Sequence, residues 1–126
     1  MKGGEINMVK MQKKSIKNPE ETRNFPKGNL KLVTFEGVTF GLATFEPGWK
    51  WSESVKPIAK TESCQAPHTN YHLSGRLHVK MDDGTEEEFG PGDIGVLPPG
   101  HDAWTVGDEP AVALDITGMV DYAKEA

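Results

Sequence analysis

The stretch from Glu62 to Trp104 reads ESCQAPHTNYHLSGRLHVKMDDGTEEEFGPGDIGVLPPGHDAW. It holds the single cysteine and all four histidines of the chain, together with an Asp-Gly pair, a Pro-Gly-Asp turn and a Pro-Pro-Gly corner. Short apolar runs alternate with these turns at intervals of about 8 to 12 residues, which is typical of antiparallel sandwiches and barrels. The residues that can carry chemistry therefore lie among the turns of an expected β domain.

The flanking sequence extends the same pattern. Residues 30–37 and 38–48 are rich in Leu, Val, Thr and Phe and meet at a Glu-Gly turn, which predicts a β-hairpin. We expect one domain over residues 21–126, preceded by a tail, residues 1–20, that could supply a strand exchanged between two chains of a dimer. Residues 118–126 are predicted to form a short C-terminal helical turn.

Composition narrows the class of protein. A chain of 126 residues fits a single domain, and its 14 glycines and nine prolines favour turns and short strands. The net charge of −5 gives no basic surface for nucleic acid, so we expect no nucleic-acid partner. No apolar run approaches about 18 residues and the start lacks a signal-peptide pattern, which predicts a cytoplasmic protein without a membrane segment.

Four pieces of the opening stretch, YHLSGRLHV, DDG, PGD and LPPGHDAW, together resemble the cupin superfamily over residues 44–116. The resemblance implies an all-β fold, a small antiparallel β-barrel of jelly-roll (double-stranded β-helix) type. It also implies a homodimer and a site in the mouth of the barrel. A small-molecule ligand would bind there.

The resemblance further implies a set of metal ligands. Counting back from Tyr71, the ligand positions of the first cupin motif fall on His68, Cys64 and Glu62. The usual histidine position of the second motif holds Ala103, whereas His101 stands two residues earlier. Because side chains two apart in a strand share a face, His101 is expected to point toward the same site.

Strand geometry sorts these candidates. His68 and His72 would be about 13 Å apart in one strand, too far to share an ion. A turn at residues 65–67 can instead bring Cys64 beside His68, and Glu62 shares a face with Cys64 in an extended segment. A thiolate with two imidazoles favours zinc or iron over magnesium or calcium. The competing interpretation makes the cysteine a small buried hydrophobe.

Further residues are expected to line the pocket or to support the ligands: Asn70, His72, Asp102, Trp49, Trp51 and Trp104. The two tryptophans at 49 and 51 are predicted to lie on one side of an extended backbone, with core packing weighed above ligand contact. Asp102 is expected either to orient an imidazole or to make a local turn bond. His78 and the acidic run at 86–88 are expected on a solvent-exposed outer face.

Three functions are consistent with this pattern. The first is a metal-dependent enzyme, an oxygenase, isomerase or hydrolase acting on a small organic molecule. The second is a non-catalytic module that binds or senses a small ligand, because a scaffold can lose its chemistry and keep its pocket. The third is a structural dimer with no small-molecule role. The sequence names no substrate.

Overall fold

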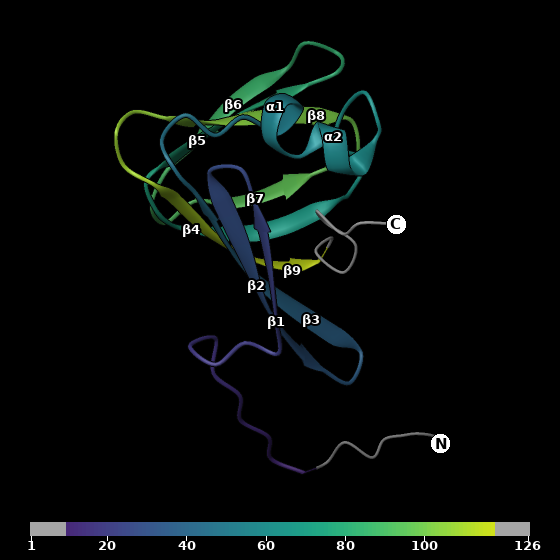
Figure 1. Ribbon diagram of the computed structural model, residues 1–126, viewed down its shortest axis with the longest axis vertical. Helices are drawn as coiled ribbons and strands as arrows, with labels where there is room; N and C mark the ends of the chain where they lie inside the picture. The colour runs from purple at the N-terminus through teal and green to yellow at the C-terminus, as the bar shows by residue number, and fades with distance from the viewer. Residues whose placement is uncertain (1–9, 118–126) are drawn as a thin grey trace.

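The computed structural model describes residues 10–117. Within that range it contains nine strands and two short helices (Figure 1): β1 (Glu21–Phe25), β2 (Gly28–Phe35), β3 (Val38–Phe45), α1 (Trp51–Ser54), α2 (Lys56–Ala59), β4 (His68–Ser74), β5 (Arg76–Met81), β6 (Glu86–Phe89), β7 (Ile94–Leu97), β8 (His101–Val106) and β9 (Ala111–Thr117). The prediction of a mainly β protein is confirmed. The expected C-terminal helical turn, residues 118–126, lies outside the described residues, as do residues 1–9 of the expected tail.

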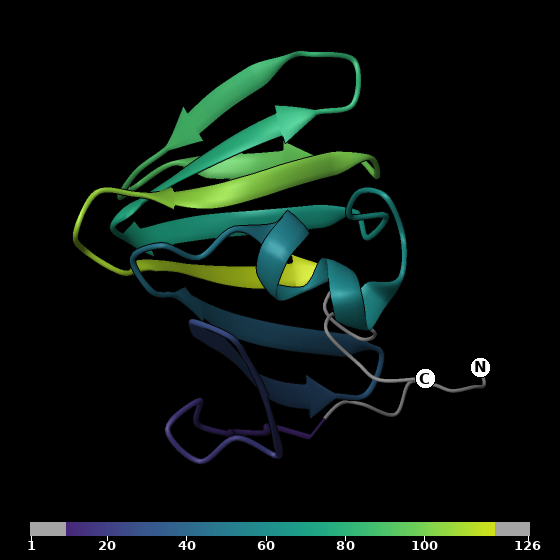
Figure 2. The same ribbon diagram turned by 45° about the horizontal axis from the view of Figure 1, so that its top comes forward.

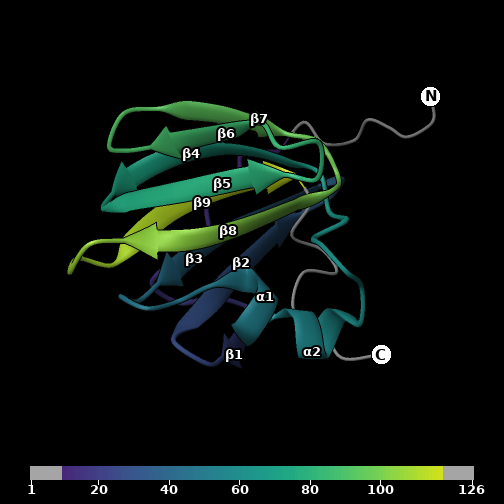
Figure 3. The same cartoon turned by 90° about the horizontal axis from the view of Figure 1, so that it is seen from above.

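The strands form two antiparallel sheets. Six strands pair in the order β1-β2-β3-β9-β4-β7, and three pair in the order β6-β5-β8. The three-stranded sheet lies at the upper end of the molecule in Figure 1, and β1, β2 and β3 lie at the lower end. The view of Figure 2 shows the same succession with β9 and β4 between these groups, and Figure 3 shows α1 beside β8.

Two of the predicted hairpins are confirmed. β2 and β3 form a hairpin whose last pair before the turn is Phe35 with Val38. Gly37 lies in the turn and adopts a φ of 83°. β5 and β6 pair across Gly84, whose φ of 94° belongs to the left-handed region that glycine tolerates best. Local turn chemistry therefore sets the register of both hairpins.

The segment between β3 and β4 differs from the prediction. Trp51 begins helix α1 rather than continuing an extended run, so the paired tryptophans do not lie on one strand. The backbone N–H of Ser52 donates to Asp102 Oδ1 at 3.1 Å, which satisfies a free donor in the first turn of α1. A carboxylate from a distant strand thus supports a helix of four residues that is too short to be stable alone. None of the helices in residues 10–117 is long and apolar enough to cross a membrane.

The core lies against the inner face of the larger sheet. Leu30, Phe45, Trp49, Trp51 and Val55 are all buried, and the rings of Phe45 and Trp49 are in contact at a tilt of 31°, with centroids 4.0 Å apart. Burial of one large apolar side chain contributes about 1.5–3 kcal/mol, so this cluster holds the connection between β3 and α1 in place.

The outer faces of the two sheets differ. The three-stranded sheet presents ion pairs, Arg76 with Glu88 at 3.0 Å and His78 with Glu86 at 2.6 Å. The outward residues of β3, β9, β4 and β7 are instead uncharged and mostly apolar, and we call this set the apolar face: Phe40, Leu42, Thr44, Thr69, Tyr71, Leu73, Ile94, Val96, Val112, Leu114 and Ile116. Ile94 and Val96 are 74% and 75% exposed.

Candidate metal centre

Three side chains from three separate segments meet in the interior. His68 is the first residue of β4 and His101 the first residue of β8, while Cys64 precedes β4 and pairs with His101 as an isolated bridge. The Cys64 N–H donates to the His101 carbonyl at 2.7 Å, and the Gly100 N–H donates to the Cys64 carbonyl at 2.7 Å. Backbone pairing therefore holds the cysteine against the start of β8, and all three side chains are buried.

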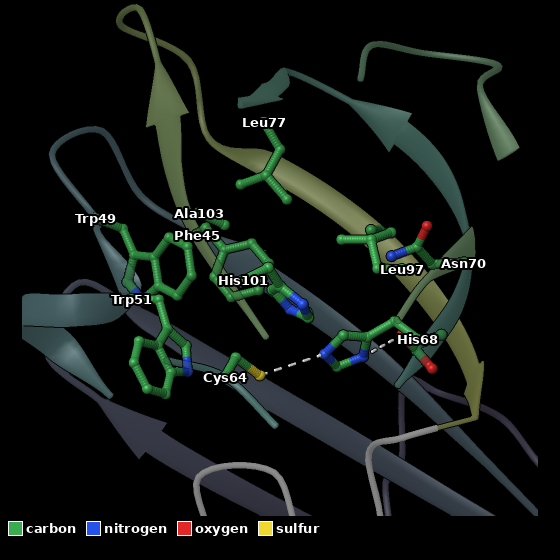
Figure 4. Close-up of a pocket in the computed structure, with 13 residues that line it drawn as sticks. Phe45, Trp49, Trp51, Cys64, His68, Asn70, Leu77, Leu97, His101 and Ala103 are labelled. Atoms are coloured by element: carbon green, nitrogen blue, oxygen red, sulfur yellow. Dashed lines mark hydrogen bonds and ion pairs between the residues drawn. The ribbon is translucent and has the colours of Figure 1, made fainter. Parts of the chain in front are cut away.

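The distances within this cluster suit one metal ion. One ligand atom from each of the three residues lies within 4.8 Å of the others, and Cys64 Sγ lies 3.7 Å from His68 Nε2 (Figure 4). Metal bonds of about 2.3 Å to sulfur and about 2.0 Å to nitrogen, at a tetrahedral angle, would place those two atoms about 3.5 Å apart. The observed separation is close to that value, so the cluster fits a tetrahedral centre with one open position.

Hydrogen bonds orient both imidazoles. His101 Nδ1 lies 2.9 Å from the carbonyl oxygen of Pro98, which can only accept, so Nδ1 carries a proton and Nε2 is the nitrogen left to bind a metal ion. His68 Nδ1 lies 2.8 Å from Asp115 Oδ2, so its Nε2 faces Cys64. Metal-binding histidines commonly use their second nitrogen in this way, and the bond raises the basicity of the nitrogen that binds.

Asp115 was missed by the sequence analysis. It is fully buried on β9, on the inward face that it shares with Ala111 and Ala113. The available signal was an acidic residue at an inward position of the apolar run AVALDIT, where burial of a carboxylate requires a partner. That partner, His68, lies 47 positions away in the chain, and only the pairing of β4 with β9 brings the two together.

In the metal-free protein, the residues of the cluster shift one another's pKa values. Burial raises the pKa of the Cys64 thiol, but hydrogen bonds and charges of His101 and His68 outweigh burial and lower this pKa to about 6. Burial lowers the pKa of His68, whereas Asp115 and Cys64 raise it, with a net result of about 9. Between these two values the metal-free cluster holds a thiolate beside an imidazolium, and the thiolate is the form that binds metal.

Titration of the metal-free protein tests this electrostatic arrangement. The thiolate absorbance in the ultraviolet is expected to appear as pH rises, with a midpoint near pH 6, against about 8.5 for a free cysteine. Because the chain has one cysteine, the Cys64→Ser variant should lose the signal completely. A midpoint above about 8, the range of a free thiol, would contradict the arrangement.

Comparison with solved structures identifies the fold. No protein-family model and no curated protein matches the chain. A cupin-like protein from Thermotoga maritima matches with a TM-score of 0.53 at 18% identity, covering 76% of this chain and 72% of that one. The fold is cupin-like.

Two further solved structures match this chain and differ in how much of their own length it covers. A Rhizobium leguminosarum protein of unknown function matches with a TM-score of 0.58 at 24% identity, over 86% of this chain and 97% of that chain. Oxalate decarboxylase from Lactobacillus farciminis matches with a TM-score of 0.58 at 19% identity, over 81% of this chain and 32% of that chain. At these identities the similarity establishes the fold alone.

Glu62 does not join the cluster in this cupin-like structure, which corrects the expected fourth ligand. Its side chain is 97% exposed and lies 3.2 Å from Lys56 Nζ. Residues 61–63 form a bend rather than a strand, so the two-residue alternation that would have placed Glu62 beside Cys64 does not apply.

Asn70 and His72 lie on the inward face of β4 that also carries His68. Asn70 lines the cavity beside the cluster, and His72 Nε2 donates to Asn70 Oδ1 at 3.1 Å. His72 stacks on Phe89 with ring centroids 4.9 Å apart, and burial lowers its pKa. His72 stands outside the cluster, in agreement with the strand-distance argument. Its N–H group holds the side-chain amide of Asn70 in place through the hydrogen bond to Oδ1.

The aromatic residues expected near the site divide into two groups. Trp49 and Trp51 line the cavity, whereas Trp104 lies on the outer face of β8, which corrects its expected place in the pocket. Trp104 stacks on His78 at 4.8 Å, so His78 has 23% of its side chain exposed rather than being fully solvated. An odd number of positions separates Trp104 from His101, and strand alternation turns the two to opposite faces.

Asp102 also faces away from the cluster. Its Oδ1 accepts from the backbone N–H groups of Ser52 and Ala103 and binds no imidazole. Asp102 was expected to orient an imidazole or to make a local turn bond; its bond to Ser52 instead spans 50 positions of the chain. Through Ser52 it connects the strand that carries His101 to the helix that carries Trp51.

Proposed function

We propose that this protein binds one zinc or iron ion through Cys64 Sγ, His68 Nε2 and His101 Nε2. The observation that carries the proposal is the convergence of these three buried atoms, with Nδ1 of both histidines already engaged. A mixed sulfur and nitrogen set suits these metals better than magnesium or calcium. When bound, such an ion would act as a Lewis acid at its open position.

The residues of the chain have separate parts in this proposal. Cys64 supplies the negative charge and His101 a neutral imidazole whose tautomer the Pro98 carbonyl sets. Asp115 holds the ring of His68 in its binding orientation. The surrounding apolar side chains exclude water, which strengthens each of these electrostatic interactions.

We further propose that the protein acts on a small organic molecule at this centre. The two sheets would be the halves of a jelly-roll barrel, with the centre in its mouth. The cavity beside the cluster measures about 30 Å³, which limits the group that reaches the ion to a few atoms.

The same small cavity also favours a second candidate, a non-catalytic protein that binds or senses such a molecule. Turnover of a substrate separates the two candidates, because a binding module would be stabilised by the molecule and leave it unchanged.

Elemental analysis tests the metal proposal. Protein purified without a chelator is expected to contain about one zinc or iron ion per chain. Protein that contains no transition metal, and that binds none when zinc or ferrous iron is added, would contradict the proposal.

We also propose that two copies associate through the apolar face. Leu42, Leu114, Tyr71 and Ile94 are directly paired neighbours and form one row across four strands. Exposed apolar areas of this kind commonly mark interaction surfaces. The residues of the apolar face carry no charge, although Lys31 of β2 borders it beside Leu42. A second copy would present the same uncharged residues, whereas a partner selected by charge would find no charged group among them. Stacked sheets pack about 10 Å apart in this way.

The association is tested with the double variant Ile94→Lys, Val96→Lys. It is expected to be monomeric in sedimentation velocity while the wild type is dimeric, because burial of unpaired ammonium groups is costly. Lys80→Glu, on the outer face of the three-stranded sheet, is the matched control and should stay dimeric. A wild type that is monomeric at all concentrations would overturn this proposal.

A further inference from the structure

The cavity beside the cluster of Cys64, His68 and His101 is lined by Trp49 and Trp51, whose indole N–H groups both lack a partner among the described residues. Trp51 is 2% exposed, and its Nε1 has no hydrogen-bond partner among residues 10–117. Buried polar groups in proteins are nearly always hydrogen-bonded, so an exception calls for an explanation such as an absent ligand. An indole nitrogen can only donate, and the missing partner must therefore be an acceptor.

The position of this donor relates it to the cluster. Trp51 lines the same cavity as Cys64, His68 and His101, and Figure 4 shows the nitrogen-bearing edge of its ring on the side of Cys64. The Ser52–Asp102 hydrogen bond ties the start of α1 to β8 one residue beyond His101. Trp51 and His101 are thus each one residue away from the two partners of the same hydrogen bond.

Asn70 adds a second donor on the opposite side of the cavity. Its Oδ1 accepts from His72, which turns its amide nitrogen toward the cavity in Figure 4. Alanines rather than larger residues stand on the inward faces of three strands around this space, at positions 43, 103 and 113. The resulting cavity of about 30 Å³ holds roughly two water-sized groups.

We propose that this cavity binds a small ligand that presents a carboxylate or carbonyl oxygen to Trp51 Nε1. This inference rests on the proposed function, because the proposed metal ion would bind the other end of the ligand. A carboxyl-sized group matches the space, and it supplies the acceptors that the indole and the amide require. Trp51 is therefore assigned as a residue that recognises the ligand.

Nuclear magnetic resonance of the zinc-loaded protein tests this assignment with acetate as the probe. The chain has three tryptophans, so three indole N–H signals are expected, and Trp51→Phe identifies that of Trp51 by its loss. Acetate should shift the Trp51 signal and leave that of Trp104 in place. The dissociation constant for acetate should rise about tenfold to a hundredfold in Trp51→Phe, because the bond to a charged acceptor is lost.

The controls separate this inference from the metal proposal. Trp104→Phe should bind acetate as the wild type does, and ethylammonium, which offers no acceptor, should leave the Trp51 signal unmoved. If zinc fails to bind, the metal proposal fails, and the titration of the metal-free protein still decides the inference. A spectrum in which acetate shifts none of the three indole N–H signals in either form would overturn it, and this outcome can be read even if Trp51→Phe does not fold.

Discussion

Replacement of Cys64, His68 or His101 by alanine is expected to reduce metal affinity by more than about a hundredfold. Each residue would supply one of only three protein ligands, and even residues that merely orient metal ligands change affinity by about tenfold to a hundredfold. The measurement is a competition titration with a chromogenic chelator, together with the metal content of each purified variant. Stability should follow, because a ligand present at a hundred times its dissociation constant contributes about 2.7 kcal/mol.

His78→Ala is the matched control for this series. His78 is also a histidine of a β-strand, but it lies on the outer face of β5 against Trp104 and Glu86. Its variant should bind metal as tightly as the wild type. If the three cluster variants bind metal as tightly as the wild type does, the convergence of Cys64, His68 and His101 serves packing alone.

Asp115→Asn is expected to weaken metal binding by about tenfold to a hundredfold while leaving all three proposed ligands in place. The carboxylate accepts from His68 Nδ1, and its replacement by a neutral amide lowers the basicity of the ring and loosens its orientation. The metal-free protein should also lose about 1.5–3 kcal/mol of unfolding free energy, the contribution of a hydrogen bond to a charged group.

The same chelator competition and a denaturant titration measure both effects. Asp93→Asn provides the control, because Asp93 Oδ2 accepts the backbone N–H of Gly90 in a turn before β7 and Asp93 is not part of the cluster. Its variant should keep the metal affinity of the wild type. An Asp115→Asn variant with unchanged affinity would reduce Asp115 to a structural partner of His68.

The amino-acid sequence by itself determined the local features of this protein. The Asp-Gly and Glu-Gly pairs require backbone conformations that few other residues tolerate, so the hairpins β5–β6 and β2–β3 were predictable. The sequence also predicted that Cys64 lies near His68 and that His72 stands apart; the 3.7 Å distance confirms the first point, although residues 65–67 form an irregular connection rather than the expected turn. These arguments hold because they depend on residues close together in the chain.

Only the tertiary structure decided the features that depend on distant residues. Asp115 reaches His68 through the pairing of two strands far apart in sequence, and Asp102 supports a helix that the local sequence did not indicate. Glu62 turns to solvent because its segment bends, and no nearby residue reveals that bend. The role of a buried charge or hydrogen-bond donor depends on the groups packed around it, and only the completed fold brings those groups together.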